Sequence, residues 1–351
     1  MKSSGGQVRR LNSPASTLVR WLALGSLSAA FTLWIGVSPV SAQVFVTVNR
    51  GLGNMPIAVI DSDPGSPTFN QIVAIMDSDL NGSNSIAFTL DGAFAWVTSC
   101  CEPRLGVFNL LYNRLDRVIS FDPLSGSHRV AMGTEGLAYV AQAGPNQILI
   151  FDSADYSLVG TIPLDQAPVD LSIRPDGRFL YTTNSNFLGT NVFVIDTLTR
   201  EVSRTILIPN ADGQGLRFSP DGAFAYMVKN CNLPGAGVVV IDTLSYAVRE
   251  LPPYVRCPRP AAFRPAGGTV YFPDVSRVSV FDTQTNSWTT PIELPNPRAA
   301  GLMTVSSQYY AYVTSHAVGE EDVVYVIDTL TNRIISTISG FQGSLGVINS
   351  M

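Results

Sequence analysis

The sequence is poor in the residues that carry most enzyme and metal chemistry. Its 351 residues include only two histidines (His128 and His316), two lysines and four cysteines, and charged residues make up 14% of the chain. Two histidines cannot build a multi-histidine copper or zinc centre, and without a Cys-x-x-Cys-His segment no c-type haem is attached. So few charges also argue against coiled coils and long amphipathic helices. We therefore expect no metal site and no cofactor.

The charge balance disfavours nucleic acid as a partner. The first 42 residues hold four basic residues and no acidic one, which leaves 18 basic against 27 acidic residues in the remainder. Nucleic-acid binding needs a basic footprint that neutralises phosphates. Gly-rich phosphate loops, Gly-x-Ser-x-Gly elbows and His-Glu-x-x-His helices are also missing. No catalytic residue is assigned from the sequence.

The first 42 residues have the pattern of a signal peptide. Three arginines within the first twenty residues precede an apolar run from Trp21 to Val37, and residues 40–42 read Val-Ser-Ala. A basic start, an apolar middle and a small-x-small end predict cleavage after Ala42 and export to the periplasm or the extracellular space. An uncleaved membrane anchor is the alternative, because seventeen apolar-biased residues just span a bilayer. After cleavage we expect no membrane association.

The rest of the chain repeats one pattern seven times. A short β-branched run ends in an acidic or amide residue at intervals of 40 to 48 residues. Each period also contains a turn of the Pro-Asp-Gly kind followed by an aromatic-rich run, as at residues 216–222 and 224–228. Such a period, with four short strands and regular turn signals, is typical of a β-propeller blade. The runs end at Asp61, Asn109, Asp152, Asp196, Asp242, Asp282 and Asp328.

The two ends of the repeat region complement each other. Residues 44–48 match the second strand of a repeat without its first strand, and residues 345–348 match a first strand without the other three. We predict an all-β, seven-bladed β-propeller of four-stranded antiparallel blades over residues 43–351, closed by pairing of the N- and C-terminal strands in one blade. Such closure leaves no long unpaired edge.

Residues 326–338 (VIDTLTNRIISTI), 219–222 (SPDG) and 312–314 (YVT) resemble the YVTN-type β-propeller repeat family. The resemblance covers essentially residues 43–351 and is specific to the architecture rather than to a reaction. It implies an exported seven-bladed propeller; similar repeats occur in surface-layer, periplasmic and lactonase-like proteins. The chain departs from the pattern at Asn109 and in weak turns at residues 133–136 and 264–268, which we expect to affect those turns only.

We interpret the repeated aspartates as turn caps rather than as a ring of metal ligands. An Asp followed by Thr or Ser accepts backbone N–H bonds within its own turn, and one carboxylate per blade lies too far from the next to share an ion. The same interpretation holds for Asp91, Asp176 and Asp221 in the Pro-Asp-Gly-like turns. We interpret both histidines as solvent-facing, with an acid–base pair as the alternative.

The four cysteines favour disulfides in an exported chain. Cys231 and Cys257 lie in two loops that leave one blade on the same face, so we predict that they pair. The adjacent Cys100 and Cys101 then form a strained vicinal ring or stay free. A vicinal bond resembles those near quinone cofactors of certain quinoprotein dehydrogenases, which makes a redox-associated role the third alternative for this chain.

The candidate binding site lies where loops lead into the innermost strands and surround one mouth of the channel, because propellers usually bind ligands there. Three arginines cluster at this mouth in an otherwise acidic chain and can hold an anion through bidentate hydrogen bonds. The predicted ligand-binding residues are Asp170, Gln214, Arg256, Arg259, Arg298 and His128.

The sequence favours a monomeric, exported binding or scaffold module without catalysis of its own. Its channel mouth would recruit a protein, peptide, glycan or small anion. The alternative is a lactonase-like hydrolase that uses the same mouth. Such a hydrolase needs several carboxylate or amide oxygens around one metal ion, and Asp170, Gln214 and Asn84 are the candidates.

Overall fold

The computed structural model describes residues 42–49, 55–99, 102–121, 127–184, 189–209, 211, 213–229, 237–295, 300–306, 309–316 and 321–351. The predicted signal peptide therefore lies outside the described residues, apart from Ala42. All regular structure in the described ranges is β-strand, and none of these residues forms a helix able to cross a membrane.

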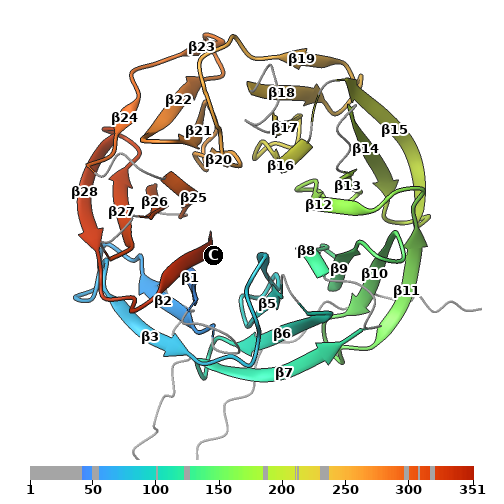
Figure 1. Cartoon of the computed structure of the whole chain (residues 1–351), viewed down its shortest axis with the longest axis horizontal. Coiled ribbons are helices and arrows are strands. Elements are labelled where there is room, and N and C mark those ends of the chain that lie inside the picture. Colours follow the sequence, from blue (N-terminus) through green and yellow to red (C-terminus); the bar gives the residue numbers. More distant parts are fainter. Residues whose placement is uncertain are drawn as a thin grey trace, which may run out of the picture. The chain divides into compact units, whose positions relative to one another are not determined.

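Seven antiparallel sheets surround a central channel, and each forms one blade (Figure 1). We number the blades in chain order and give their strands from the channel outwards. Blade 1 contains β29 (Ser344–Ser350), β1 (Gln43–Asn49), β2 (Ile57–Asp61) and β3 (Ile72–Met76). Blade 2 contains β4 (Ser85–Phe88), β5 (Phe94–Thr98), β6 (Arg104–Asn109) and β7 (Arg114–Ser120). Blade 3 contains β8 (Ser127–Met132), β9 (Leu137–Gln142), β10 (Gln147–Asp152) and β11 (Leu158–Pro163).

The remaining blades follow the same order, except that the outer strand of blade 6 is split in two. Blade 4 contains β12 (Pro168–Ile173), β13 (Phe179–Asn184), β14 (Gly189–Asp196) and β15 (Glu201–Pro209). Blade 5 contains β16 (Gly213–Phe218), β17 (Phe224–Lys229), β18 (Gly237–Asp242) and β19 (Val248–Glu250). Blade 6 contains β20 (Ala262–Phe263), β21 (Thr269–Asp274), β22 (Arg277–Asp282), β23 (Ser287–Trp288) and β24 (Ile292–Glu293). Blade 7 contains β25 (Ala300–Val305), β26 (Tyr310–Ser315), β27 (Val323–Asp328) and β28 (Arg333–Ile338).

Blade 1 closes the ring with strands from both ends of the repeat region. β29 pairs antiparallel with β1, and Val46 faces Ile348 across the ladder. The Thr47 hydroxyl accepts a hydrogen bond from the backbone N–H of Val347 at 2.8 Å. The predicted seven-bladed propeller, with four antiparallel strands per blade and this closure, is confirmed.

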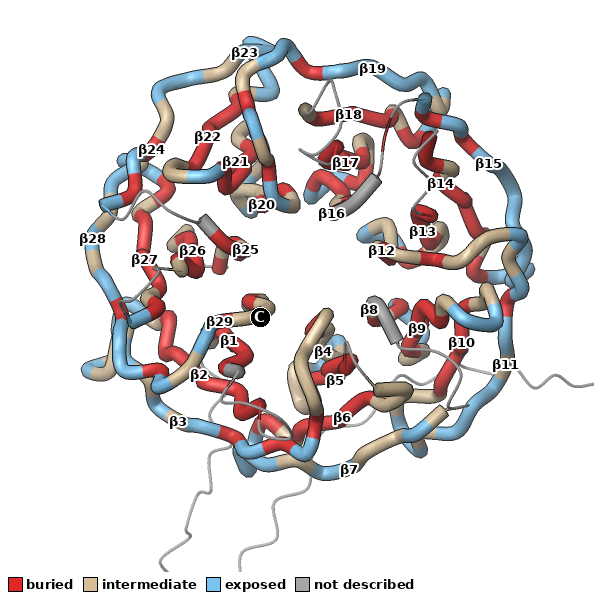
Figure 2. Tube along the Cα trace, viewed as in Figure 1, coloured by how far each residue is buried: buried red, intermediate tan, exposed pale blue. Residues whose placement is uncertain are grey.

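The core lies between neighbouring blades and along their middle strands (Figure 2). The third strand of a blade is buried at most positions, as in β10, whereas the outer strand β28 alternates between exposed and covered residues. All seven blades place an aromatic ring on the second strand, opposite the residue two before the repeated Asp or Asn, and each of these rings is at most 1% exposed. These rings are Phe45, Trp96, Tyr139, Tyr181, Tyr226, Tyr271 and Tyr312.

The repeated aspartates cap their own turns, as predicted. Asp242 Oδ1 accepts hydrogen bonds from the N–H groups of Leu244 and Ser245, at 3.0 and 2.8 Å. Asn109 accepts the equivalent pair of backbone bonds through its amide oxygen, at 3.1 and 3.2 Å. Asn109 therefore preserves the turn, because an amide oxygen accepts the same backbone hydrogen bonds as a carboxylate oxygen.

Each turn between a third and a fourth strand also contains one residue in the left-handed region, with φ between 48° and 66°. Asparagine tolerates this conformation better than most residues and holds the position in four of the seven turns. The seven residues are Asn70, Asn113, Tyr156, Arg200, Tyr246, Asn286 and Asn332.

Candidate functional site

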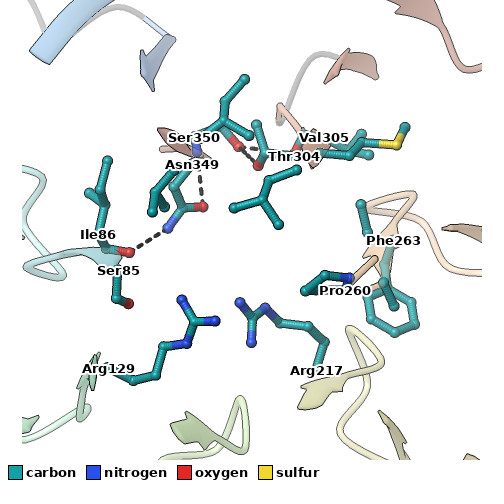
Figure 3. Close-up of a pocket in the computed structure, with 16 residues that line it drawn as sticks. Ser85, Ile86, Arg129, Arg217, Pro260, Phe263, Thr304, Val305, Asn349 and Ser350 are labelled. Atoms are coloured by element: carbon teal, nitrogen blue, oxygen red, sulfur yellow. Dashed lines mark hydrogen bonds between the residues drawn. The ribbon is translucent and has the colours of Figure 1, made fainter. Parts of the chain in front are cut away.

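The channel contains a cavity of about 320 Å³ lined by the inner strands (Figure 3). On one side, Arg129 from β8 and Arg217 from β16 point their guanidinium groups toward each other and into the cavity. Polar side chains from β25 and β29 lie on the other side, among them Thr304 and Asn349. Apolar residues of β20, β25 and β29 fill the remaining wall.

A buried carboxylate lies between the two arginines. Asp170 on β12 is 1% exposed, and its Oδ1 lies 3.0 Å from Arg129 Nε and 3.6 Å from Arg217 Nη1. Its Oδ2 accepts a hydrogen bond from the backbone N–H of Leu216 at 2.5 Å. Asp170 therefore links three successive blades and offsets one of the two positive charges.

Part of each guanidinium group is left for a ligand. Arg129 Nη1 donates to the carbonyl oxygen of Asn84, and Arg217 Nη1 donates to that of Leu216 at 2.7 Å. Within the described ranges, Arg129 Nη2 and both Nε and Nη2 of Arg217 have no hydrogen-bond partner. These N–H groups are available to an acceptor in the cavity, and a guanidinium fork matches the two oxygens of a carboxylate or phosphate.

The arginine pair carries a surplus of one positive charge. Desolvation lowers the pKa of Arg217, and repulsion from Arg129 adds to this effect, whereas Asp170 acts in the opposite direction. Arginine nevertheless stays protonated in proteins. An anion between the two guanidinium groups would relieve their repulsion and replace the water that each loses in the channel.

The opposite wall is held by its own hydrogen bonds. Asn349 Nδ2 donates to the carbonyl oxygen of Ile86 at 2.9 Å, and its Oδ1 accepts from the N–H of Ser350 at 3.0 Å (Figure 3). The hydroxyls of Ser350 and Thr304 lie 2.8 Å apart. These contacts fix the shape of the cavity and add no charge, so the arginine side determines the sign of the ligand.

The structure separates the residues that the sequence grouped at the channel mouth. Asp170 contacts the arginine pair. Arg256 is exposed and lines a different depression, together with Asp274, Arg277 and Glu293. Arg259 is exposed, and its backbone N–H donates to the carbonyl oxygen of Pro273 at 2.7 Å.

Other predicted residues fall partly or wholly outside the described ranges. Arg298 lies outside them, and of His128 on β8 and Gln214 on β16 only the backbone is described. The other histidine, His316, places its Nδ1 2.7 Å from Asp322 Oδ2. A binding role for Arg298, His128 and Gln214 stays a prediction.

Two further observations concern the lactonase-like and the redox-associated alternatives. The described residues contain no group of three or more His, Cys, Asp or Glu side chains placed to hold a metal ion. The carboxylate of Asp170, a candidate metal ligand, is already engaged by two arginines. Cys257 is disulfide-bonded, while Cys100, Cys101 and Cys231 lie outside the described residues, so the predicted pairing stays untested.

Sequence reasoning missed both arginines of the cavity, because it searched the loops rather than the inner strands. Arg217 carried a usable signal: it stands between Leu216 and Phe218, which are buried, so alternation turns its side chain to the opposite face of the strand, away from that core. Arg129 carried none, since the ladder shifts register between Ser127 and Val130 and a bulge re-aims the side chain.

No family model matches the chain. The seven-bladed beta-propeller protein Rv1057 of Mycobacterium tuberculosis is 28% identical over 132 residues, which are 36% of this chain and 33% of that protein. The match thus spans about a third of the length of this curated relative.

Solved structures share the architecture at low identity. Hydrazine synthase from Kuenenia stuttgartiensis superposes with a TM-score of 0.68 at 17% identity, covering 81% of this chain and 94% of that chain. Dihydro-heme d1 dehydrogenase NirN in complex with DHE gives a TM-score of 0.61 at 18% identity, and the match covers 86% of this chain and 64% of that chain. At such identities the likeness shows the fold alone. The class of the protein is therefore that of the seven-bladed β-propellers.

Proposed function

We propose that this chain is an exported binding module of the YVTN-type repeat family that holds a small anion in its channel. The observation that carries the proposal is the pair Arg129 and Arg217, which share one buried carboxylate and direct free N–H groups into one cavity. The signal-like first 42 residues support export.

The size and charge of the site define the ligand class. A cavity of about 320 Å³ is within the range of small-molecule sites and too small for a folded partner. Two guanidinium groups at one point favour a carboxylate, phosphate or sulfate group over a neutral ligand. The apolar part of the lining, including Pro260 and Leu302, suits the carbon skeleton of an organic acid.

Neutralising either arginine should weaken anion binding. We expect Arg217→Gln to raise the Kd for small carboxylates by about tenfold or more, because a hydrogen bond to a charged group contributes about 1.5–3 kcal/mol. Titration calorimetry of the purified chain with acetate, succinate, citrate and phosphate measures this, and binding should weaken as salt is added.

The matched control is the double variant Arg256→Gln/Arg259→Gln, which removes two exposed arginines outside the cavity. We expect it to bind the same anions as the unaltered chain. If this variant loses binding while Arg217→Gln keeps it, the anion binds at the loops of the channel mouth and the proposed channel site is wrong.

A further inference from the structure

A second cavity, of about 420 Å³, lies between blades 5 and 6. Its apolar wall consists of three aromatic rings, Phe224 and Tyr226 from β17 and Phe263 from β20, with Pro220 and Pro265 beside them. Tyr226 and Phe263 meet edge to face with ring centroids 5.3 Å apart. Phe263 also lines the channel cavity.

This cavity exists because the seam between blades 5 and 6 is filled less than the seam between blades 2 and 3. There, Phe94 at the start of the second strand packs against Tyr156 in the left-handed turn position of the next blade. The residue equivalent to Tyr156 in blade 6 is Asn286, whose amide oxygen instead accepts a hydrogen bond from Arg249 at 3.0 Å. Among the residues that the structure describes, Phe224 therefore makes no ring contact like that of Phe94.

The turn of blade 6 adds to the space. It reads Ala266-Gly267-Gly268-Thr269 where blade 5 has Asp221-Gly222-Ala223-Phe224, so its side chains are small. A Cβ atom built at Gly267 would meet nothing within 4 Å.

The hydroxyl of Tyr226 is the polar group that this cavity offers. The equivalent hydroxyls of Tyr271 and Tyr312 donate to asparagine side chains of the following blade, at 2.9 and 2.8 Å. Tyr226 is 1% exposed, and its hydroxyl has no hydrogen-bond partner in the part of the chain that the structure describes. A hydroxyl that no protein group engages can donate to a ligand, so an acceptor that reaches it gains affinity.

We propose that this cavity is a second binding site, for a small uncharged aromatic molecule whose oxygen accepts a hydrogen bond from Tyr226. Aromatic walls favour a ring that stacks or meets them edge to face. The carboxylate of Asp221 at the cavity disfavours an anion, which distinguishes this ligand from the one in the channel. Burial raises the pKa of Tyr226, so the hydroxyl keeps the proton that it donates.

The probes are acetophenone and benzamide, two uncharged rings that carry a carbonyl oxygen, titrated into the full chain and followed by saturation-transfer NMR and calorimetry. We expect Tyr226→Phe to weaken binding by about 3- to 10-fold, the loss of one neutral hydrogen bond.

Tyr181→Phe is the matched control, because Tyr181 is the equivalent residue of blade 4 and does not line the cavity. It should bind the probes unchanged, as should Arg217→Gln, which separates this site from the channel. Thermal unfolding verifies that each variant is folded, and Tyr226→Phe keeps the ring while it removes only the hydroxyl. No binding by the unaltered chain at millimolar probe, or equal binding by Tyr226→Phe, overturns the proposal.

Discussion

At the scale of single residues, the aspartates divide into two kinds that the sequence does not distinguish. Asp170 is buried against two arginines from neighbouring blades, whereas Asp221 and its equivalents accept hydrogen bonds within their own exposed turns. Only the first kind takes part in the channel site. Asp170 was predicted as a site residue from its position near the channel mouth, but its arginine partners come from strands 40 or more residues away and cannot be read from local spacing.

The turn aspartates make the fold sensitive to acid. A hydrogen bond from the Ser219 hydroxyl and the N–H of Ala223 lower the pKa of Asp221, and similar bonds lower the pKa of Asp91. Because the folded pKa lies below the unfolded one, the stabilisation is complete above about pH 4 and is lost as the pH falls through the folded pKa.

We predict that Asp221→Asn is somewhat less stable than the unaltered chain at pH 7 but loses less stability below pH 4, because the ionised carboxylate accepts the stronger turn hydrogen bonds. The amide oxygen still accepts the turn hydrogen bonds, as Asn109 shows, but it does not titrate. Urea unfolding at pH 7 and at pH 3 measures both effects. An equally steep loss in the variant would mean that other groups control acid unfolding.

At the scale of the element, the third turn of each blade depends on one left-handed residue. Asn113, with φ at 48°, is exposed and lies in the turn between β6 and β7. A β-branched residue is strongly disfavoured in this region, and a left-handed conformation costs about 1–2 kcal/mol for an ordinary residue.

We therefore expect Asn113→Val to lower the free energy of unfolding by about 1–2 kcal/mol. Asn113→Gly is the control, since glycine adopts this conformation freely and should stay close to the original stability. Chemical denaturation measures both variants. Equal stability of the two would show that this turn is not strained by a β-branched residue.

Strand pattern explains which part of the site was predictable. Period-2 alternation and turn residues specify each blade, and alternation also places Arg217 on the strand face opposite the buried Leu216 and Phe218. The inner strands β8, β12, β16, β25 and β29 each shift register once in the described ladders. A bulge adds one residue to the strand, so the side chains before it point to the opposite face from the one that alternation predicts. The direction of a side chain such as Arg129 therefore depends on where the bulge forms in the folded sheet.

At the scale of the whole molecule, the fold could be predicted because seven copies of one pattern constrain each other. A single copy is ambiguous, but six matching Asp positions, one Asn and two complementary ends allow a ring of seven blades and little else. The second cavity could not be predicted from the sequence. It arises where blade 6 has small turn residues and an asparagine instead of an aromatic ring, and these positions meet blade 5 only in the folded ring.

We predict that the closing strand is required for the ring. Deleting residues 344–351 removes β29, which leaves the edge of β1 unpaired and uncovers apolar residues such as Val46. The shortened chain should unfold at a lower temperature, with a broader transition, and should elute as aggregates from a sizing column. A chain that lacks only Met351 serves as the control. An unchanged midpoint after the larger deletion would show that blade 1 holds without its inner strand.

The seam in blade 1 also sets the order of events during biosynthesis. Thr47 and the backbone of Val347 are 300 positions apart, yet they are hydrogen-bonded partners in one sheet. The ring therefore stays open until the ribosome has made nearly the whole chain. For the export proposed above, such a delay would keep the ring open during passage across the membrane, because the earliest strand pairs with the latest.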